Sequence, residues 1–88
     1  MFDQSTTIGD FLDTAASRRP TPGGGSVTAL VGALAASMGE MTLNYSIGRK
    51  GHEAYDDELR PALAELSRAR ELLTRLMTED QAAYEAMT

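Results

Sequence analysis

The stretch Thr21-Pro22-Gly23-Gly24-Gly25-Ser26 opens a long apolar segment, Val27 to Gly48, around which the rest of the chain is organised. Pro22 fixes its own φ, and the three glycines after it allow a tight bend and the close approach of a ligand to the backbone. Ser26, or Gly25 before it, is a candidate N-cap. The stretch therefore predicts a tight connection that leads into a helix.

Wound as a helix at about 100° per residue, the apolar segment has two faces that differ in side-chain size. The large face carries Val27, Leu30, Val31, Leu34, Met38, Met41 and Tyr45, and the small face carries Ala29, Gly32, Ala33, Ala36, Gly39, Glu40, Leu43 and Ile47. A glycine inside a helix costs about 1 kcal/mol relative to alanine, and close approach of another helix offsets that cost. We therefore expect a central helix buried between neighbours, with a second helix, possibly from another subunit, against the small face.

Two further helices are predicted by the spacing of apolar residues. Ile8, Phe11, Leu12 and Ala15 indicate a helix from Ile8 to about Ser17, with Thr7 as its cap. A long helix is expected over residues 55–87, with an apolar stripe formed by Tyr55, Leu59, Leu63, Leu66, Leu73, Met77, Tyr84 and Met87. Pro61 either lies in the first turn of this helix or kinks it. The expected fold is an all-α bundle of a short first helix, a buried central helix and a long third helix.

The composition indicates one small acidic domain covering residues 1–88. A chain of 88 residues buries only roughly 60–65% of its unfolded surface, so partner subunits are a plausible source of further burial. The absence of cysteine fits a cytoplasmic protein.

Charge and patterning exclude several classes of function. The net charge is −5, and the eight Lys and Arg form no stripe, which argues against nucleic acid binding. Val27 to Met38 is too short, and too rich in small and hydroxyl residues, to span a bilayer. The N-terminus has no basic region before an apolar run, which argues against a signal peptide.

Two acidic residues occupy unusual positions. Asp80 falls within the apolar stripe of the third helix, where it is either a buried carboxylate suited to proton transfer or an exposed residue of a new helix starting at Thr78, because Thr78 and Gln81 are spaced as a capping box. Glu40 lies on the small face, where it is either a site residue or a side chain that meets water as the helix leaves the core.

Other chemistry has weaker support. A glycine loop before a helix is a potential anion site, but no Lys follows it and no strand precedes it, so it is not a Walker A loop. His52 is the only histidine and there is no cysteine, which argues against a zinc site. We expect no metal and no permanently bound cofactor.

Several motifs in succession resemble the formiminotetrahydrofolate cyclodeaminase and methenyltetrahydrofolate cyclohydrolase family. The motifs are Phe11-Leu12, Pro20 to Val27, Glu40-Met41, Asn44, Ile47 to Lys50, Tyr55 with Asp56 to Glu58, and Glu79-Asp80 with Ala83-Tyr84. The resemblance implies an all-α, dimeric fold with a folate cleft. Family members release ammonia from a formimino folate to give methenyl folate, or open methenyl folate to formyl folate with water. Their domains are considerably longer, so the chain resembles an N-terminal portion.

Carried over by this resemblance, Asp80 is the candidate acid/base, and Glu40 is a weaker catalytic candidate. The residues expected to bind the tetrahydrofolate substrate are Thr21, Pro22, Gly23, Gly24, Gly25, Ser26, Asn44, Arg49 and Lys50, the last two through the glutamate tail. The alternative hypothesis is a non-catalytic helical oligomerisation module. The chain stops at Thr88 without a C-cap, which fits a truncated product or a fragment.

Overall fold

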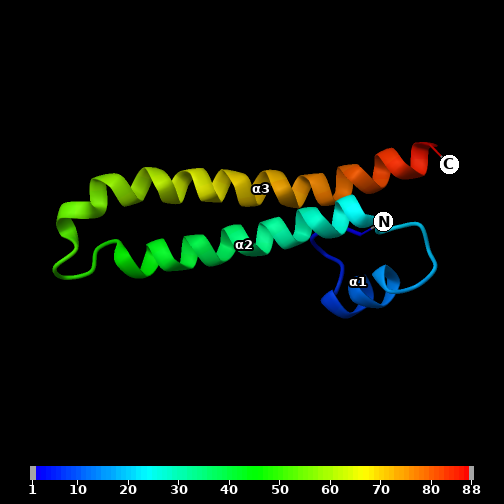
Figure 1. Ribbon diagram of the computed structural model, residues 1–88, viewed down its shortest axis with the longest axis horizontal. Coiled ribbons are helices and arrows are strands. Elements are labelled where there is room, and N and C mark those ends of the chain that lie inside the picture. The colour runs from blue at the N-terminus through cyan, green and yellow to red at the C-terminus, as the bar shows by residue number, and fades with distance from the viewer. Residues whose placement is uncertain (1, 88) are drawn as a thin grey trace.

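The computed structural model describes the backbone of residues 2–87 and the side chains of residues 2–79, and this part of the chain is all-α. A short helix, α1 (Ile8–Ala15), precedes two long helices, α2 (Gly24–Ser46) and α3 (Asp56–Met87), and a 3-10 turn, η1 (Glu53–Tyr55), leads into α3. The long helices lie side by side and antiparallel, with α1 against one end of the pair (Figure 1). The molecule is elongated, with extents of 54 × 23 × 18 Å.

Helix α1 forms as its spacing predicts. The Thr7 hydroxyl accepts a hydrogen bond from the Asp10 amide at 3.1 Å and so caps the helix. The helix ends at Ala15, slightly before the expected Ser17. Phe11, which is 6% exposed, packs with Ala29 and Met77 in the core and meets the Phe2 ring edge-on. Thus α1 is held by one aromatic anchor.

Helix α2 starts earlier than expected. Its N-cap is Gly23, with no side-chain cap hydrogen bond, so the prediction that Ser26 or Gly25 caps the helix is wrong. The reason is tertiary, because the Ser26 hydroxyl donates to the Met77 carbonyl of α3 at 2.7 Å. The helix ends at Ser46, and Gly48, with φ of +77°, turns the chain away.

Helix α3 runs without interruption through the two positions where a break was considered. Pro61 lies inside it, five residues after Asp56, so the first-turn interpretation is wrong. No new helix starts at Thr78, because α3 continues to Met87. Tyr55 precedes α3 and is 58% exposed, so it does not belong to the buried stripe. Tyr84 and Met87 lie outside the residues with described side chains.

The small face of α2 packs against α3, as predicted. A Cβ built on Gly32 would lie 3.1 Å from Leu73 Cδ1, and one built on Gly39 would lie 3.0 Å from Leu66 Cδ1. Ala29, Ala33 and Ala36 of the same face are buried. The glycines therefore serve close helix packing, which offsets their conformational cost.

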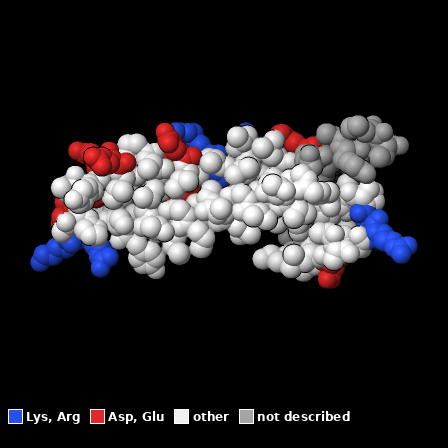
Figure 2. Space-filling view, viewed as in Figure 1, with Lys and Arg blue, Asp and Glu red and all other residues white. Residues whose placement is uncertain are grey.

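The large face of α2 is uncovered, so the expectation of a helix buried on both sides is wrong within one chain. Its exposed members are Val31, Leu34, Met38, Met41 and Tyr45, from 46% to 74% exposed. The uncharged surface extends through the middle of the molecule, and charged side chains collect along α3 and at the ends (Figure 2). The sequence showed both apolar faces, and within the described residues the part of the large face from Val31 to Tyr45 is left exposed.

The length of α2 removes the sequence-based argument that its apolar segment is too short to span a bilayer. That argument counted only Val27 to Met38. The helix has 23 residues and is long and apolar enough to cross a membrane by length and composition alone. Core helices of soluble proteins pass the same test. Charged α3 runs beside it, and carrying Arg60, Arg68 and Arg70 through hydrocarbon is costly. The arginines of α3 therefore argue against a membrane-spanning pair, and not the burial of α2, since only 22% of its apolar window is buried.

Candidate functional site

The glycine stretch lies at one end of the helix pair, at the start of α2. Pro22 is buried and follows a cis peptide bond from Thr21. Gly24 and Gly25 form the first turn of α2 and are exposed, whereas Gly23 is half-buried. Ser26 is 0% exposed. The motif therefore divides into an anchored part and a part whose backbone faces the surface.

A shallow groove of about 480 Å³ runs beside this first turn, between α2 and α3. It is lined by Gly25, Thr28, Ala29, Leu73, Leu76 and Glu79. The leucines and the alanine provide an apolar wall, and the Thr28 hydroxyl and the Glu79 carboxylate supply polar groups. A flat ring with hydrogen-bonding edges suits such a lining, in which a few polar groups orient a ligand on an apolar wall.

Thr28, Leu76 and Glu79 were not singled out from the sequence. Glu79 was noticed only as part of the acidic pair with Asp80. The signal that points to them is spacing: Leu73, Leu76 and Glu79 follow one another at three-residue intervals, so they share one side of α3.

The register of the two long helices determines where Asp80 lies. Gly39 contacts Leu66 and Gly32 contacts Leu73, so seven residues along α2 correspond to seven along α3. One further step of seven pairs Gly25 with Asp80. The backbone of Asp80 is therefore level with the exposed first turn of α2, although its side chain lies outside the described residues.

Glu40 pairs with Arg70 across the helix interface. Arg70 Nε donates to Glu40 Oε2 at 2.9 Å and to Oε1 at 3.2 Å, and the Glu40 side chain is only 13% exposed. Glu40 is thus largely shielded from water and is paired with Arg70. It shares a second shallow hollow with Asn44 and Tyr45, about halfway or more along α2 from the glycine turn.

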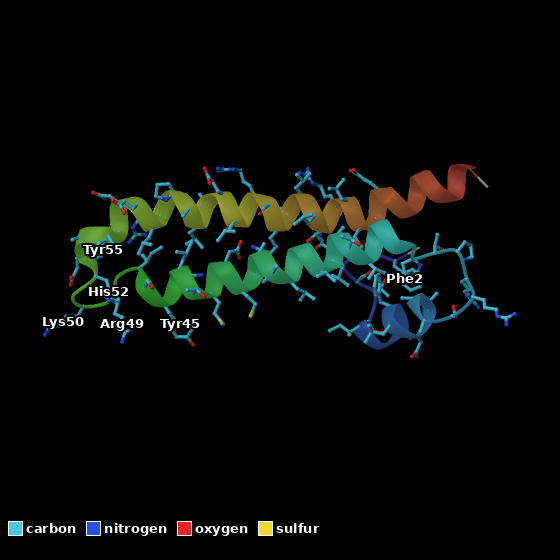
Figure 3. All side chains as sticks on the ribbon, in the orientation of Figure 1. Phe2, Tyr45, Arg49, Lys50, His52 and Tyr55 are labelled. Atoms are coloured by element: carbon cyan, nitrogen blue, oxygen red, sulfur yellow. The ribbon has the colours of Figure 1, made fainter. Side chains whose placement is uncertain are left out.

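Arg49 and Lys50 lie at the opposite end of the molecule from the glycine stretch. They are exposed in the connection between α2 and η1, near His52 (Figure 3). The 23 residues of α2 separate them from Gly24, a span of about 34 Å at the helical rise. Within one chain, the predicted substrate-binding residues therefore form two groups and not one site.

A larger hollow, of about 800 Å³, lies on the α1 side of the helix pair. Its apolar lining includes Phe11, Leu12, Leu30 and Leu34, with Arg70 also present. None of the three glycines lines it. We place the candidate site at the smaller groove, because that one combines the glycine turn with an acidic residue. Among residues with described side chains, no group of three His, Asp or Glu is placed to hold a metal ion.

Comparison with known proteins shows the family of this chain. The sequence profile described as formiminotransferase-cyclodeaminase matches residues 7–88. The chain belongs to the formiminotransferase-cyclodeaminase family. The match includes the glycine stretch, both long helices and the Glu79-Asp80 pair.

Two named proteins and one crystal structure are similar to this chain. The chain is 37% identical over 81 residues to a methenyltetrahydrofolate cyclohydrolase of Methylorubrum extorquens, covering 92% of this chain and 39% of that protein. It is 41% identical over 59 residues to a formimidoyltransferase-cyclodeaminase of Dictyostelium discoideum, covering 67% of this chain and 11% of that one. The crystal structure of formiminotetrahydrofolate cyclodeaminase from Thermotoga maritima matches with a TM-score of 0.85 and 36% identity, over 92% of this chain and 41% of that chain. The chain therefore spans about two fifths or less of these relatives.

Proposed function

We propose that this chain acts in folate one-carbon chemistry, with the groove beside Gly25 as the place where a tetrahydrofolate derivative binds. The relatives named above include a methenyltetrahydrofolate cyclohydrolase and a cyclodeaminase. What supports the proposal is the helix register: continued one step of seven beyond Gly32 and Leu73, it brings the backbone of Asp80 level with the exposed glycine turn.

Asp80 is the proposed acid/base. In formimino folate, closing the one-carbon bridge forms a new carbon–nitrogen bond and expels ammonia, which must gain a proton. In methenyl folate, opening the bridge adds water at the bridge carbon and returns a proton to the departing nitrogen. Both reactions need one group that moves a proton to or from the atoms bonded to this carbon, and a carboxylate within an apolar stripe is suited to the task.

The glycine turn supports the proposal from the other side of the groove. The amides of a helix's first turn lack partners inside the helix, so they favour negative charge and hydrogen-bond acceptors. Gly24 and Gly25 carry no side chain that would keep a flat ring away from them. A pterin ring presents such acceptors, and its apolar faces match the wall formed by Leu73 and Leu76.

The test is turnover of methenyltetrahydrofolate, followed by loss of the methenyl absorbance, together with titration of the chain with the same compound. We expect Asp80→Asn to lower turnover by about 100-fold or more while leaving the chain helical by circular dichroism. Asp57→Asn, an exposed acid in the first turn of the same helix, is the matched control and should change nothing. Full turnover by Asp80→Asn would refute the assigned role, and a folded chain without folate affinity would refute the function.

We also propose that the chain associates with a second copy of itself through the large face of α2, and that it works in the cytoplasm. The exposed part of this face runs from Val31 to Tyr45, and Met38 is its midpoint. Two copies paired antiparallel about Met38 would bring the partner's Lys50 level with Ser26. Such pairing would unite the two separated groups of predicted substrate-binding residues, with the basic pair near the glutamate tail.

A single cysteine tests this association cleanly, because the chain has none of its own. Met38→Cys should form a disulfide-linked dimer on mild oxidation, whereas Ala64→Cys, at an exposed position of α3, should not. Sedimentation of the unmodified chain should show a dimer at the same concentration. A folded monomer, or equal cross-linking of both variants, would contradict the proposal. A dimer without any folate affinity would support the alternative of a non-catalytic oligomerisation module.

A further inference from the structure

Ser26 has the most enclosed side chain in the described part of the molecule, at 0% exposed. Its hydroxyl crosses from the first turn of α2 to α3 and donates to the Met77 carbonyl at 2.7 Å. The serine is thus turned away from the surface that Gly24 and Gly25 expose.

The interface around this hydrogen bond is otherwise apolar. Leucine side chains rest on Gly32 and Gly39, and these apolar contacts set the register in the middle of the pair without any directional hydrogen bond. Glu40 and Arg70 make another polar contact between α2 and α3, and it lies nearer the opposite end of the helix pair. Near the glycine turn, the hydrogen bond from Ser26 to Met77 is directional, so it limits rotation and sliding as well as separation of the helices.

We infer that Ser26 is a positioning residue, which holds the exposed Gly24-Gly25 turn at a fixed height and rotation against the α3 turn carrying Glu79 and Asp80. This rests on the proposed function, in which those two turns form opposite sides of the folate groove. Ser26 acts from behind the groove and does not touch the substrate. The inference replaces the contact with substrate that the family resemblance implies for this serine.

Removing the Ser26 hydroxyl should change the position of the first turn of α2 without unfolding the chain. A backbone carbonyl has two lone pairs, so Met77 can keep its helical hydrogen bond when the serine hydroxyl is removed. Ser26→Ala also keeps the side chain small in a fully enclosed position. We therefore expect Ser26→Ala to remain folded, with the first turn of α2 free to shift against α3.

The experiment compares Ser26→Ala with Ser37→Ala. Ser37 is on the same helix, and its hydroxyl bonds to Ala33 of that helix at 2.9 Å, not to α3. Methenyltetrahydrofolate affinity is measured at a temperature where both variants and the unmodified chain are fully folded. Backbone amide NMR signals of residues 24, 25, 79 and 80 are recorded without ligand. We expect Ser26→Ala to lose about tenfold or more in affinity, since small misplacements of binding groups are costly, and to shift these four signals, whereas Ser37→Ala does neither.

The outcomes distinguish this inference from the function on which it rests. If the unmodified chain binds folate and Ser26→Ala binds equally well, the inference is overturned while the function stands. If the unmodified chain binds no folate, the function is refuted, and the NMR signals still decide whether Ser26 fixes the register. Unchanged signals at residues 79 and 80 in Ser26→Ala would overturn the inference in either case.

Discussion

Replacing Gly39 by valine tests whether the small face of α2 is the surface that holds the helix pair together. A Cβ at this position would lie 3.0 Å from Leu66 Cδ1, 3.7 Å from Cδ2 and 3.9 Å from Cγ, so the three outer carbons of Leu66 already surround it. The two γ-methyl groups of valine extend beyond that point. Overpacking of this kind costs about 1–3 kcal/mol.

The local effect of the substitution has the opposite sign and is smaller. Valine gains only about 0.4 kcal/mol over glycine in helix propensity, so packing should decide the result. A net loss of about 1–2 kcal/mol corresponds to a fall in Tm of about 5–15 °C for a domain of this size. Thermal unfolding measures this fall in Tm, followed by circular dichroism at about 222 nm, where the helical backbone gives its signal.

The matched control is Gly9→Val in α1. A Cβ at Gly9 would meet nothing within 4 Å, so only the propensity gain remains, and Tm should stay the same or rise slightly. The reasoning is refuted if Gly39→Val unfolds within about 2 °C of the unmodified chain, well below the shift expected from overpacking. A fall of similar size in Gly9→Val would refute it equally, because the effect would then come from valine and not from the interface.

Three further predictions follow from single contacts. Glu40→Ala should destabilise the chain by about 1 kcal/mol, a modest value because Arg70 is partly exposed. A double-mutant cycle with Arg70→Ala, measured by urea unfolding, should show that the effects of the two substitutions are coupled. Thr7→Ala removes the cap of α1 and should cost about 1 kcal/mol, measured as lost protection of the Asp10 amide. The side-chain and backbone hydrogen bonds from Ser5 lower the pKa of the Asp3 carboxyl below 3.8, so their stabilisation is present at neutral pH and lost as the pH falls through the lowered pKa. Ser5→Ala should raise the pKa of Asp3 in an NMR titration, and no change would contradict the assignment.

The sequence by itself determined the helices and the close packing of two of them. Residue spacing gave the three helices, because a 3.6-residue period and a capping threonine are local properties of the chain. The small face was informative because Gly32 and Gly39 are unfavourable in a helix unless another helix comes close. Which leucine faces each glycine was not predicted from the sequence and came from the structure.

Only the tertiary structure decided how these faces were used. It showed that Ser26 bonds to Met77 in place of capping α2, that Glu40 pairs with Arg70, and that Arg49 and Lys50 lie far from the glycine turn. The physical reason is that hydrogen bonds and ion pairs between helices join residues from thirty to more than fifty positions apart. Local preference limits which residues face inward, but the partner of a polar group depends on what the other helix presents there.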